Sequence, residues 1–206
     1  MYAKIEGAAT RGAAGAHAGG RHPRPPPDIS AESRGILDVE HAMKTRAAFL
    51  SLIAELEGDS RELRRVSEMN ERAWLRIREG AADPIDWGAL GFTLHNLYGI
   101  LENYFLRISK FFENNLPADR RHKGLVDSMR LEIAGVRPSL FPDDAGYRQA
   151  LTLMRFRHRF RNLYGEDLDP EKTSEVQATA ASFMQSFPAM HRLFIDKIRA
   201  ISGGLE

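Results

Sequence analysis

The sequence predicts an all-α protein that folds as an up-down antiparallel helical bundle. Apolar residues recur at three- and four-residue spacing in five successive segments, and turn-forming residues separate these segments. No segment alternates apolar and polar residues in the way that a half-buried strand does. At 206 residues, the chain has the length of one domain with a single core, plus a tail.

The N-terminal segment, residues 1–42, offers little that a core can bury. Ala, Gly, Arg and Pro dominate its first part, which contains the run Pro25-Pro26-Pro27. We expect a disordered or poorly ordered tail here, and a helical domain over residues 43–206. The arginines of the tail could bind RNA, but we favour a simple upstream extension, because Met43 stands directly before the first strongly periodic segment.

The first two predicted helices are long and are joined by a short turn. The first carries an apolar seam over residues 49–77 that keeps its phase across Gly58, so we expect this glycine to soften the helix without breaking it. Residues 80–84 end this helix, and a second apolar stripe covers residues 87–112. Such a short connection places the two helices side by side and antiparallel.

Three further helices are expected to close the bundle. The third is short, with apolar residues spaced helically over 125–133, and a loop with two prolines follows it. The fourth has one of two adjacent aspartates as its N-cap and runs through residues 147–163. Asp169-Pro170 opens the fifth helix, which Pro188 is expected to kink or interrupt.

The composition argues against several classes of function. The 29 Lys and Arg residues nearly balance 28 Asp and Glu residues, so any anion-binding site must be a local patch. The absence of cysteine excludes disulfides, thiolate metal sites and cysteine nucleophiles. We find no metal-ligand spacing of histidines, no glycine-rich phosphate loop and no apolar run long enough to span a membrane. We therefore expect a cytoplasmic protein with no metal, no cofactor and no membrane association.

The fourth predicted helix contains a densely basic sequence with a local charge of about +4. Seven consecutive positions carry it: Arg155, Phe156, Arg157, His158, Arg159, Phe160 and Arg161. At about 100° per residue, Arg157, Arg161 and Tyr164 gather on the side away from the phenylalanines, and His158 and Asn162 flank them. Guanidinium groups bind phosphate oxygens in pairs, so this edge is a candidate phosphate site. A solvated basic helix whose arginines pair with acidic neighbours is the alternative.

This stretch resembles the signature of the HEPN superfamily, and in particular that of HepT-like ribonuclease toxins. The signature is an arginine, a polar residue, three further residues, a histidine, any residue and a tyrosine. Arg157, His158 and Tyr164 match it, whereas Asn162 stands where the histidine is expected. The likeness covers about residues 43–201 and includes the second helix and the residues that follow Tyr164.

The resemblance implies a metal-independent endoribonuclease in which the ribose 2′-hydroxyl attacks the adjacent phosphate at the interface of a homodimer. It also implies a nucleotidyltransferase-like antitoxin as partner, which can modify the motif tyrosine, here Tyr164. Arg157 would stabilise the developing negative charge. The amide of Asn162 does not titrate near neutral pH, and can only orient the phosphate or the hydroxyl. His158, one helical turn earlier, is our candidate for the proton transfer.

Other residues are expected to complete this site. Arg155, Arg159 and Arg161 are our candidates for binding RNA phosphates. His95 and Glu102 lie seven residues apart on one face of the second helix, so both can support the site from across a cleft. An ion pair between Glu102 and an arginine is the simpler interpretation, and we favour it.

Two functions remain open from the sequence. The first is a toxin-type ribonuclease of a toxin–antitoxin pair, acting on RNA. The second is a regulatory protein that binds RNA or protein through the basic cleft but does not cleave, which the asparagine at position 162 favours. A coiled-coil adaptor would need its first helix to pair with another chain, and the short turn over residues 80–84 argues against that.

Overall fold

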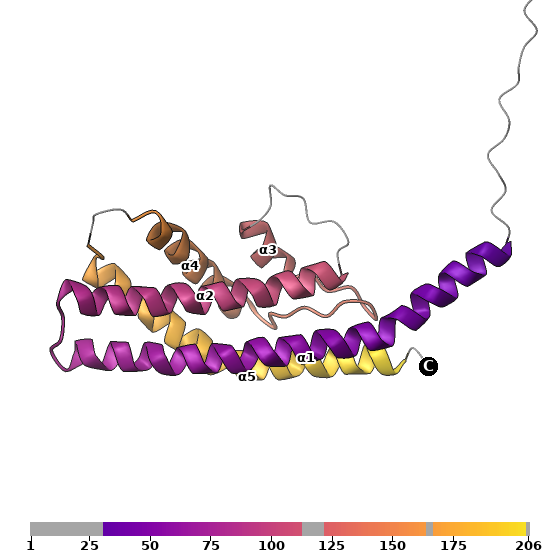
Figure 1. Cartoon of the computed structure of the whole chain (residues 1–206), viewed down its shortest axis with the longest axis horizontal. Helices are drawn as coiled ribbons and strands as arrows, with labels where there is room; N and C mark the ends of the chain where they lie inside the picture. The colour runs from indigo at the N-terminus through magenta and orange to yellow at the C-terminus, as the bar shows by residue number, and fades with distance from the viewer. Residues whose placement is uncertain (1–30, 113–121, 164–166, 205–206) are drawn as a thin grey trace, which may run out of the picture.

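The computed structural model describes residues 31–112, 122–163 and 167–204, with side chains from residue 46 onward. Within these ranges the chain forms five helices and no strand, which confirms the predicted all-α fold (Figure 1). The helices are α1 (Ala31–Arg78), α2 (Pro84–Phe112), α3 (Lys123–Ser128), α4 (Asp144–Arg161) and α5 (Pro170–Gly203). Residues 1–30 of the predicted tail lie outside the described residues, whereas α1 begins within the segment 1–42.

α1 and α2 form a long antiparallel hairpin (Figure 1). The turn uses Gly80 at a φ of 105°, a left-handed conformation that glycine adopts at little cost. Asp83 then caps α2, because its carboxylate accepts two backbone N–H groups of the first turn. α1 continues without a break through Gly58, as the unbroken apolar seam predicts. A buried hydrogen bond joins the pair, donated by Asn70 Nδ2 to Thr93 Oγ1 at 2.9 Å.

The core is centred on α2, which packs against all four other helices. Its fully buried apolar and aromatic side chains repeat every three or four residues: Leu90, Leu94, Leu97, Leu101, Tyr104, Phe105 and Ile108. Burying a large apolar side chain stabilises a protein by roughly 1.5–3 kcal/mol, so this seam sets the rotation of α2 firmly. The rotation in turn fixes which face of α2 carries His95 and Glu102.

α4 is seated on α2 and α5 by specific local contacts. Asp143 is its N-cap, since its Oδ1 accepts the backbone N–H groups of Ala145 and Gly146 at 2.9 and 3.3 Å. Gly146 lets α5 approach closely, because a Cβ at this position would lie 2.9 Å from Met190 Sδ. α4 is thereby held at its start, which fixes the direction in which its basic end projects.

The end of α3 differs from the expectation, and α5 follows one of the two alternatives expected at Pro188. α3 ends at Ser128, whereas the apolar pattern extended it to Ile133, which instead pairs with Arg137 in a turn. Arg137 is buried and donates to the Ser128 carbonyl at 2.6 Å, and the same carbonyl accepts the N–H of Leu131 at 3.1 Å, so the chain leaves the helix here in a tight turn that a buried side chain holds. Pro188 does not interrupt α5, although the ribbon changes direction along its length (Figure 1). Buried residues on both sides of the proline keep the helix packed: Phe183, Phe187, Met190 and Phe194.

Within the described ranges, no helix combines the length and the apolar character needed to cross a membrane.

Candidate functional site

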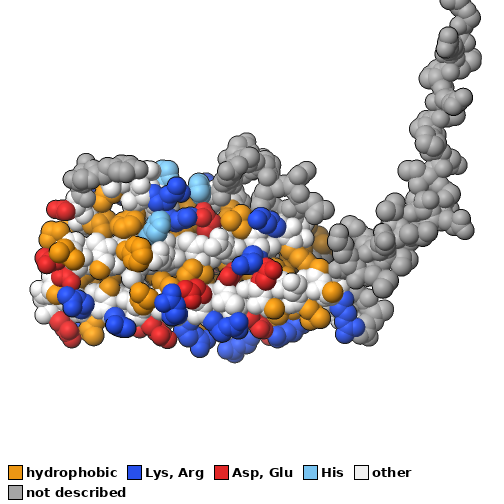
Figure 2. All heavy atoms as spheres, viewed as in Figure 1, with side chains coloured by type: hydrophobic (Ala, Val, Ile, Leu, Met, Phe, Trp, Pro, Cys, Tyr) orange, Lys and Arg blue, Asp and Glu red, His pale blue; other side chains and the backbone are white. Residues whose placement is uncertain are grey.

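The basic sequence of α4 lies at the C-terminal end of the helix, on the surface of the bundle. Leu153 and Phe156 are buried toward the core, whereas His158, Arg159 and Arg161 are exposed. The helix therefore has the amphipathic register that the spacing predicts. Figure 2 shows Lys, Arg and His side chains gathered over this part of the molecule, above α2.

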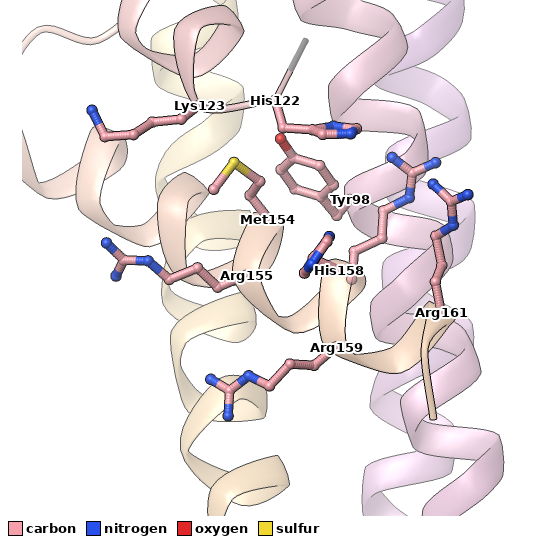
Figure 3. A pocket seen from close by; sticks show the side chains of 9 residues that line it. Tyr98, His122, Lys123, Met154, Arg155, His158, Arg159 and Arg161 are labelled. Atoms are coloured by element: carbon pink, nitrogen blue, oxygen red, sulfur yellow. The ribbon is translucent and has the colours of Figure 1, made fainter. Parts of the chain in front are cut away.

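A pocket of about 360 Å³ opens at this surface, between α2, the start of α3 and α4. The side chains that line it are Tyr98, His122, Lys123, Met154, Arg155, Arg157, His158, Arg159 and Arg161 (Figure 3). All four arginines singled out in the sequence thus border one cavity, together with His158. Seven of the nine lining residues are Lys, Arg or His, in a chain whose formal net charge is only +1. Such a local concentration of positive charge attracts anions.

Glu102, on α2, lies beside the pocket and contacts two of its basic residues. Its Oε2 accepts a hydrogen bond from Arg157 Nη1, and its Oε1 lies 3.0 Å from His122 Nδ1. The Glu102 side chain is 12% exposed and that of Arg157 is 20% exposed, so their ion pair is largely shielded from water. Charge pairs in such surroundings interact more strongly than pairs at the open surface. From the sequence we favoured an ion pair between Glu102 and an arginine, and in the structure this arginine is Arg157 of the signature.

Two buried polar groups on α2 adjoin this ion pair. The guanidinium carbon of Arg157 lies over the Tyr98 ring, 5.8 Å from the ring centroid. Burial raises the pKa of the Tyr98 hydroxyl. Burial lowers the pKa of His95, and the positive charges of Arg157 and Arg161 lower it further. Neither the Tyr98 hydroxyl nor His95 Nδ1 has a hydrogen-bond partner among the described residues. His95 therefore lies within electrostatic reach of the arginines, but it does not line the pocket, and its support of the site stays a prediction.

The close contact between α2 and the end of α4 depends on Gly91. A Cβ at this position would lie 2.5 Å from Leu168 Cδ1 and 2.7 Å from Phe160 Cε2, closer than side chains approach one another. The Phe160 ring also packs against His95 and Phe156, with ring centroids 5.4 and 5.8 Å away. The missing side chain of Gly91 thus lets the last turn of α4 settle on α2. This contact brings the arginines to Glu102.

A comparison with known protein families identifies the family of this chain. The family model described as HepT-like protein matches residues 89–198, which is just over half of the chain and runs from α2 almost to the end of α5. The chain belongs to the HepT-like family. Every residue that lines the pocket of this HepT-like protein falls inside the matched range. No curated protein and no solved structure matches the chain.

Of the two other signature positions in this HepT-like protein, 162 and 164, the structure describes only the first. Asn162 is the C-cap of α4, and its Nδ2 donates to the carbonyl oxygen of His158 at 3.0 Å. Its side chain is exposed and is not among the pocket-lining residues. Tyr164 lies outside the described residues. The parts of both residues in RNA chemistry stay predictions.

The sequence analysis missed four residues that line the pocket of this HepT-like protein: Tyr98, His122, Lys123 and Met154. Tyr98 carried a signal, because it lies four residues before Glu102 and therefore on the same face of α2. His122 carried none, since it precedes a short helix and lies outside any periodic segment. Only the packing of α3 against α2 and α4 shows that it belongs to the site.

Proposed function

We propose that this HepT-like protein is a toxin-type, metal-independent endoribonuclease that binds RNA phosphates in the pocket between α2, α3 and α4. The clustering of four arginines and His158 around one cavity carries the proposal, because the chain as a whole has a formal net charge of only +1. Arginine forks suit phosphate oxygens, and local positive charge is the main source of affinity for the RNA backbone.

The proposed chemistry needs no metal ion. His158 takes the proton of a ribose 2′-hydroxyl, and the oxygen then attacks the adjacent phosphorus. Arg157 stabilises the negative charge that develops on the phosphoryl oxygens. Its ion pair with Glu102 orients the guanidinium through Nη1, and we assign the phosphate contact to the other end of the fork, because Nε is buried. The P–O5′ bond breaks and the leaving 5′-oxygen takes up a proton from water or from a general acid, which gives a 2′,3′-cyclic phosphate and a 5′-hydroxyl.

Membership of the HepT-like family supports two protein partners for this activity. One is a second copy of the chain, which would bring two α4 basic ends to a shared RNA site. The other is a nucleotidyltransferase-like antitoxin that neutralises the enzyme and can modify Tyr164. We place this toxin–antitoxin pair in the cytoplasm.

RNA cleavage in buffer that contains a metal chelator tests this function. Arg157→Ala and His158→Ala are each expected to lower the cleavage rate at least about 100-fold, the usual contribution of a charge-stabilising donor or of a proton-transfer group. Arg148→Ala is the matched control, since Arg148 is on the same helix, is 75% exposed and pairs with Asp144 outside the pocket. Full activity in both pocket variants would refute the proposed site.

A second function is favoured by the position of Asn162. Its amide is bonded to the helix that carries it and supplies no proton, which fits a regulatory protein that binds RNA or protein without cleaving. Expression separates the two functions. A toxin arrests growth unless its antitoxin is co-expressed, and Arg157→Ala relieves the arrest. A protein that only binds is harmless when it is expressed. It binds RNA without cleaving it, and its affinity for RNA falls when Arg155 is replaced by alanine.

A further inference from the structure

The pocket contains a second histidine, which comes from a different part of the chain. His122 directly precedes α3, and its side chain lines the same cavity as His158 of α4. Figure 3 shows the two imidazole rings on different sides of the pocket. Cleavage by a 2′-hydroxyl requires two proton transfers, one from the attacking oxygen and one to the leaving oxygen. A pocket with two imidazoles can supply both.

Glu102 holds His122 in a defined orientation. Its Oε1 lies 3.0 Å from His122 Nδ1, so a proton on Nδ1 is donated to the carboxylate and Nε2 is left to face a substrate. Carboxylate–histidine pairs fix the ring and its tautomer in many enzymes. The carboxylate is itself restrained, because Arg157 holds its other oxygen. One acidic side chain therefore orients both a phosphate-binding group and an imidazole.

We propose that His122 is a second catalytic histidine, positioned by Glu102, and that it donates the proton that the 5′-oxygen needs in order to leave. This inference rests on the proposed ribonuclease function and supplies a proton transfer that Asn162 cannot perform. The 2′-hydroxyl proton passes to His158 as the O2′–P bond forms. The P–O5′ bond breaks as His122 Nε2 gives its proton to O5′. Both rings then regain their starting state by proton exchange with water.

The contacts of the two histidines decide this division of roles. When its ring is protonated, as a proton donor must be, His122 forms a charge-assisted hydrogen bond to Glu102. The neighbouring Lys123 does not compete for Glu102, because its Nζ forms an ion pair with Asp127 Oδ2 at 2.8 Å. The His158 ring has no carboxylate partner among the described residues and is exposed at the pocket, free to accept a proton.

A change of leaving group tests the proposal directly. The substrates are an RNA oligonucleotide that the wild type cleaves and the same oligonucleotide with sulfur in place of the bridging 5′-oxygen at that linkage. A thiolate leaves without being protonated, so it needs no general acid. We expect His122→Ala to lower kcat on the oxygen substrate at least about 100-fold, with KM within about threefold, and to cleave the sulfur substrate at nearly the wild-type rate. His158→Ala is expected to lose activity on both substrates.

Two further variants separate proton donation from general damage to the pocket. Lys123→Ala removes a neighbouring charge but keeps the imidazole, so any loss is expected to be equal on the two substrates. Glu102→Gln removes the carboxylate charge, and part of its loss is expected to be recovered on the sulfur substrate. His122 is about half exposed, so His122→Ala should melt at the wild-type temperature, and His122→Gln is the substitute if it does not.

The outcomes distinguish the two levels of inference. If His122→Ala retains full activity on the oxygen substrate, or loses activity equally on both substrates, the role of His122 as proton donor is refuted while the ribonuclease function stands. If the wild-type protein cleaves no RNA, both are overturned.

Discussion

Replacing Gly91 with alanine tests how closely α4 is seated on α2. The new Cβ would lie 2.5 Å from Leu168 Cδ1 and 2.7 Å from Phe160 Cε2. The Phe160 ring has little freedom to move away, because it also packs against His95. Overpacking of this kind costs about 1–3 kcal/mol, whereas alanine in a helix gains about 1 kcal/mol over glycine. We therefore expect Gly91→Ala to lower the free energy of unfolding by a net of about 0–2 kcal/mol.

Gly99→Ala is the matched control on the same helix. A Cβ at Gly99 meets no atom within 4 Å, so this variant keeps the helix-propensity gain without the clash. The two variants should differ by about 1–3 kcal/mol, with Gly99→Ala the more stable. Each kcal/mol corresponds to roughly 2–4 °C in melting temperature for a chain of this size.

Denaturant unfolding followed by far-ultraviolet circular dichroism measures the difference, at one fixed protein concentration because a homodimer would make stability concentration-dependent. RNA cleavage by Gly91→Ala should fall as well, since the displaced Phe160 carries the end of α4 away from Glu102. If Gly91→Ala proves as stable as Gly99→Ala, then Phe160 and Leu168 yield without strain, and the seating of α4 does not depend on the missing side chain.

Two further predictions concern buried polar groups. Burial lowers the pKa of His95 and of His191 in the folded state. Below the unfolded pKa of about 6.5, the unfolded state therefore binds more protons than the folded state. The free energy of unfolding should be highest above that pH and should decrease as the pH falls from about 7 to 5. Denaturant titrations across this range should show the decrease in the wild type and a shallower slope in a His95→Gln, His191→Gln double variant; an unchanged slope would contradict it. Asn70→Ala removes the donor to the buried Thr93 hydroxyl and should lower the free energy of unfolding by about 1–3 kcal/mol, measured by denaturant unfolding; a loss below about 0.5 kcal/mol would contradict it.

The helices of this protein could be predicted because their signals are local. The apolar seam kept its phase through Gly58, and α1 indeed continues through this glycine. The end of α3 could not be predicted in the same way. Arginine normally belongs at the surface, yet Arg137 is buried and takes the Ser128 carbonyl, which only the tertiary packing reveals.

In the candidate site, too, the residues with a local sequence signal could be predicted and those placed by tertiary packing could not. Arg157 and Arg161 were expected to share an edge because helical geometry alone sets their register. Both border the pocket, and so do Arg155 and Arg159, which that geometry did not place on the same edge. His122 could not be found from the sequence, because its partner Glu102 lies 20 residues earlier on another helix. Asn162 was considered for its place in the signature, whereas its local position at the end of a helix accounts for the capping bond that it makes.

The closing position of α5 has a consequence for the order in which the pocket forms during synthesis. α5 contacts α1, α2 and α4, and Figure 1 shows it beside α1, where Arg199 pairs with Glu57 across 142 residues of sequence. The arginine cluster is therefore synthesised before the helix that completes the core beneath it. A chain truncated before Pro170 would contain all nine pocket residues but would lack the α5 side of the support for α4.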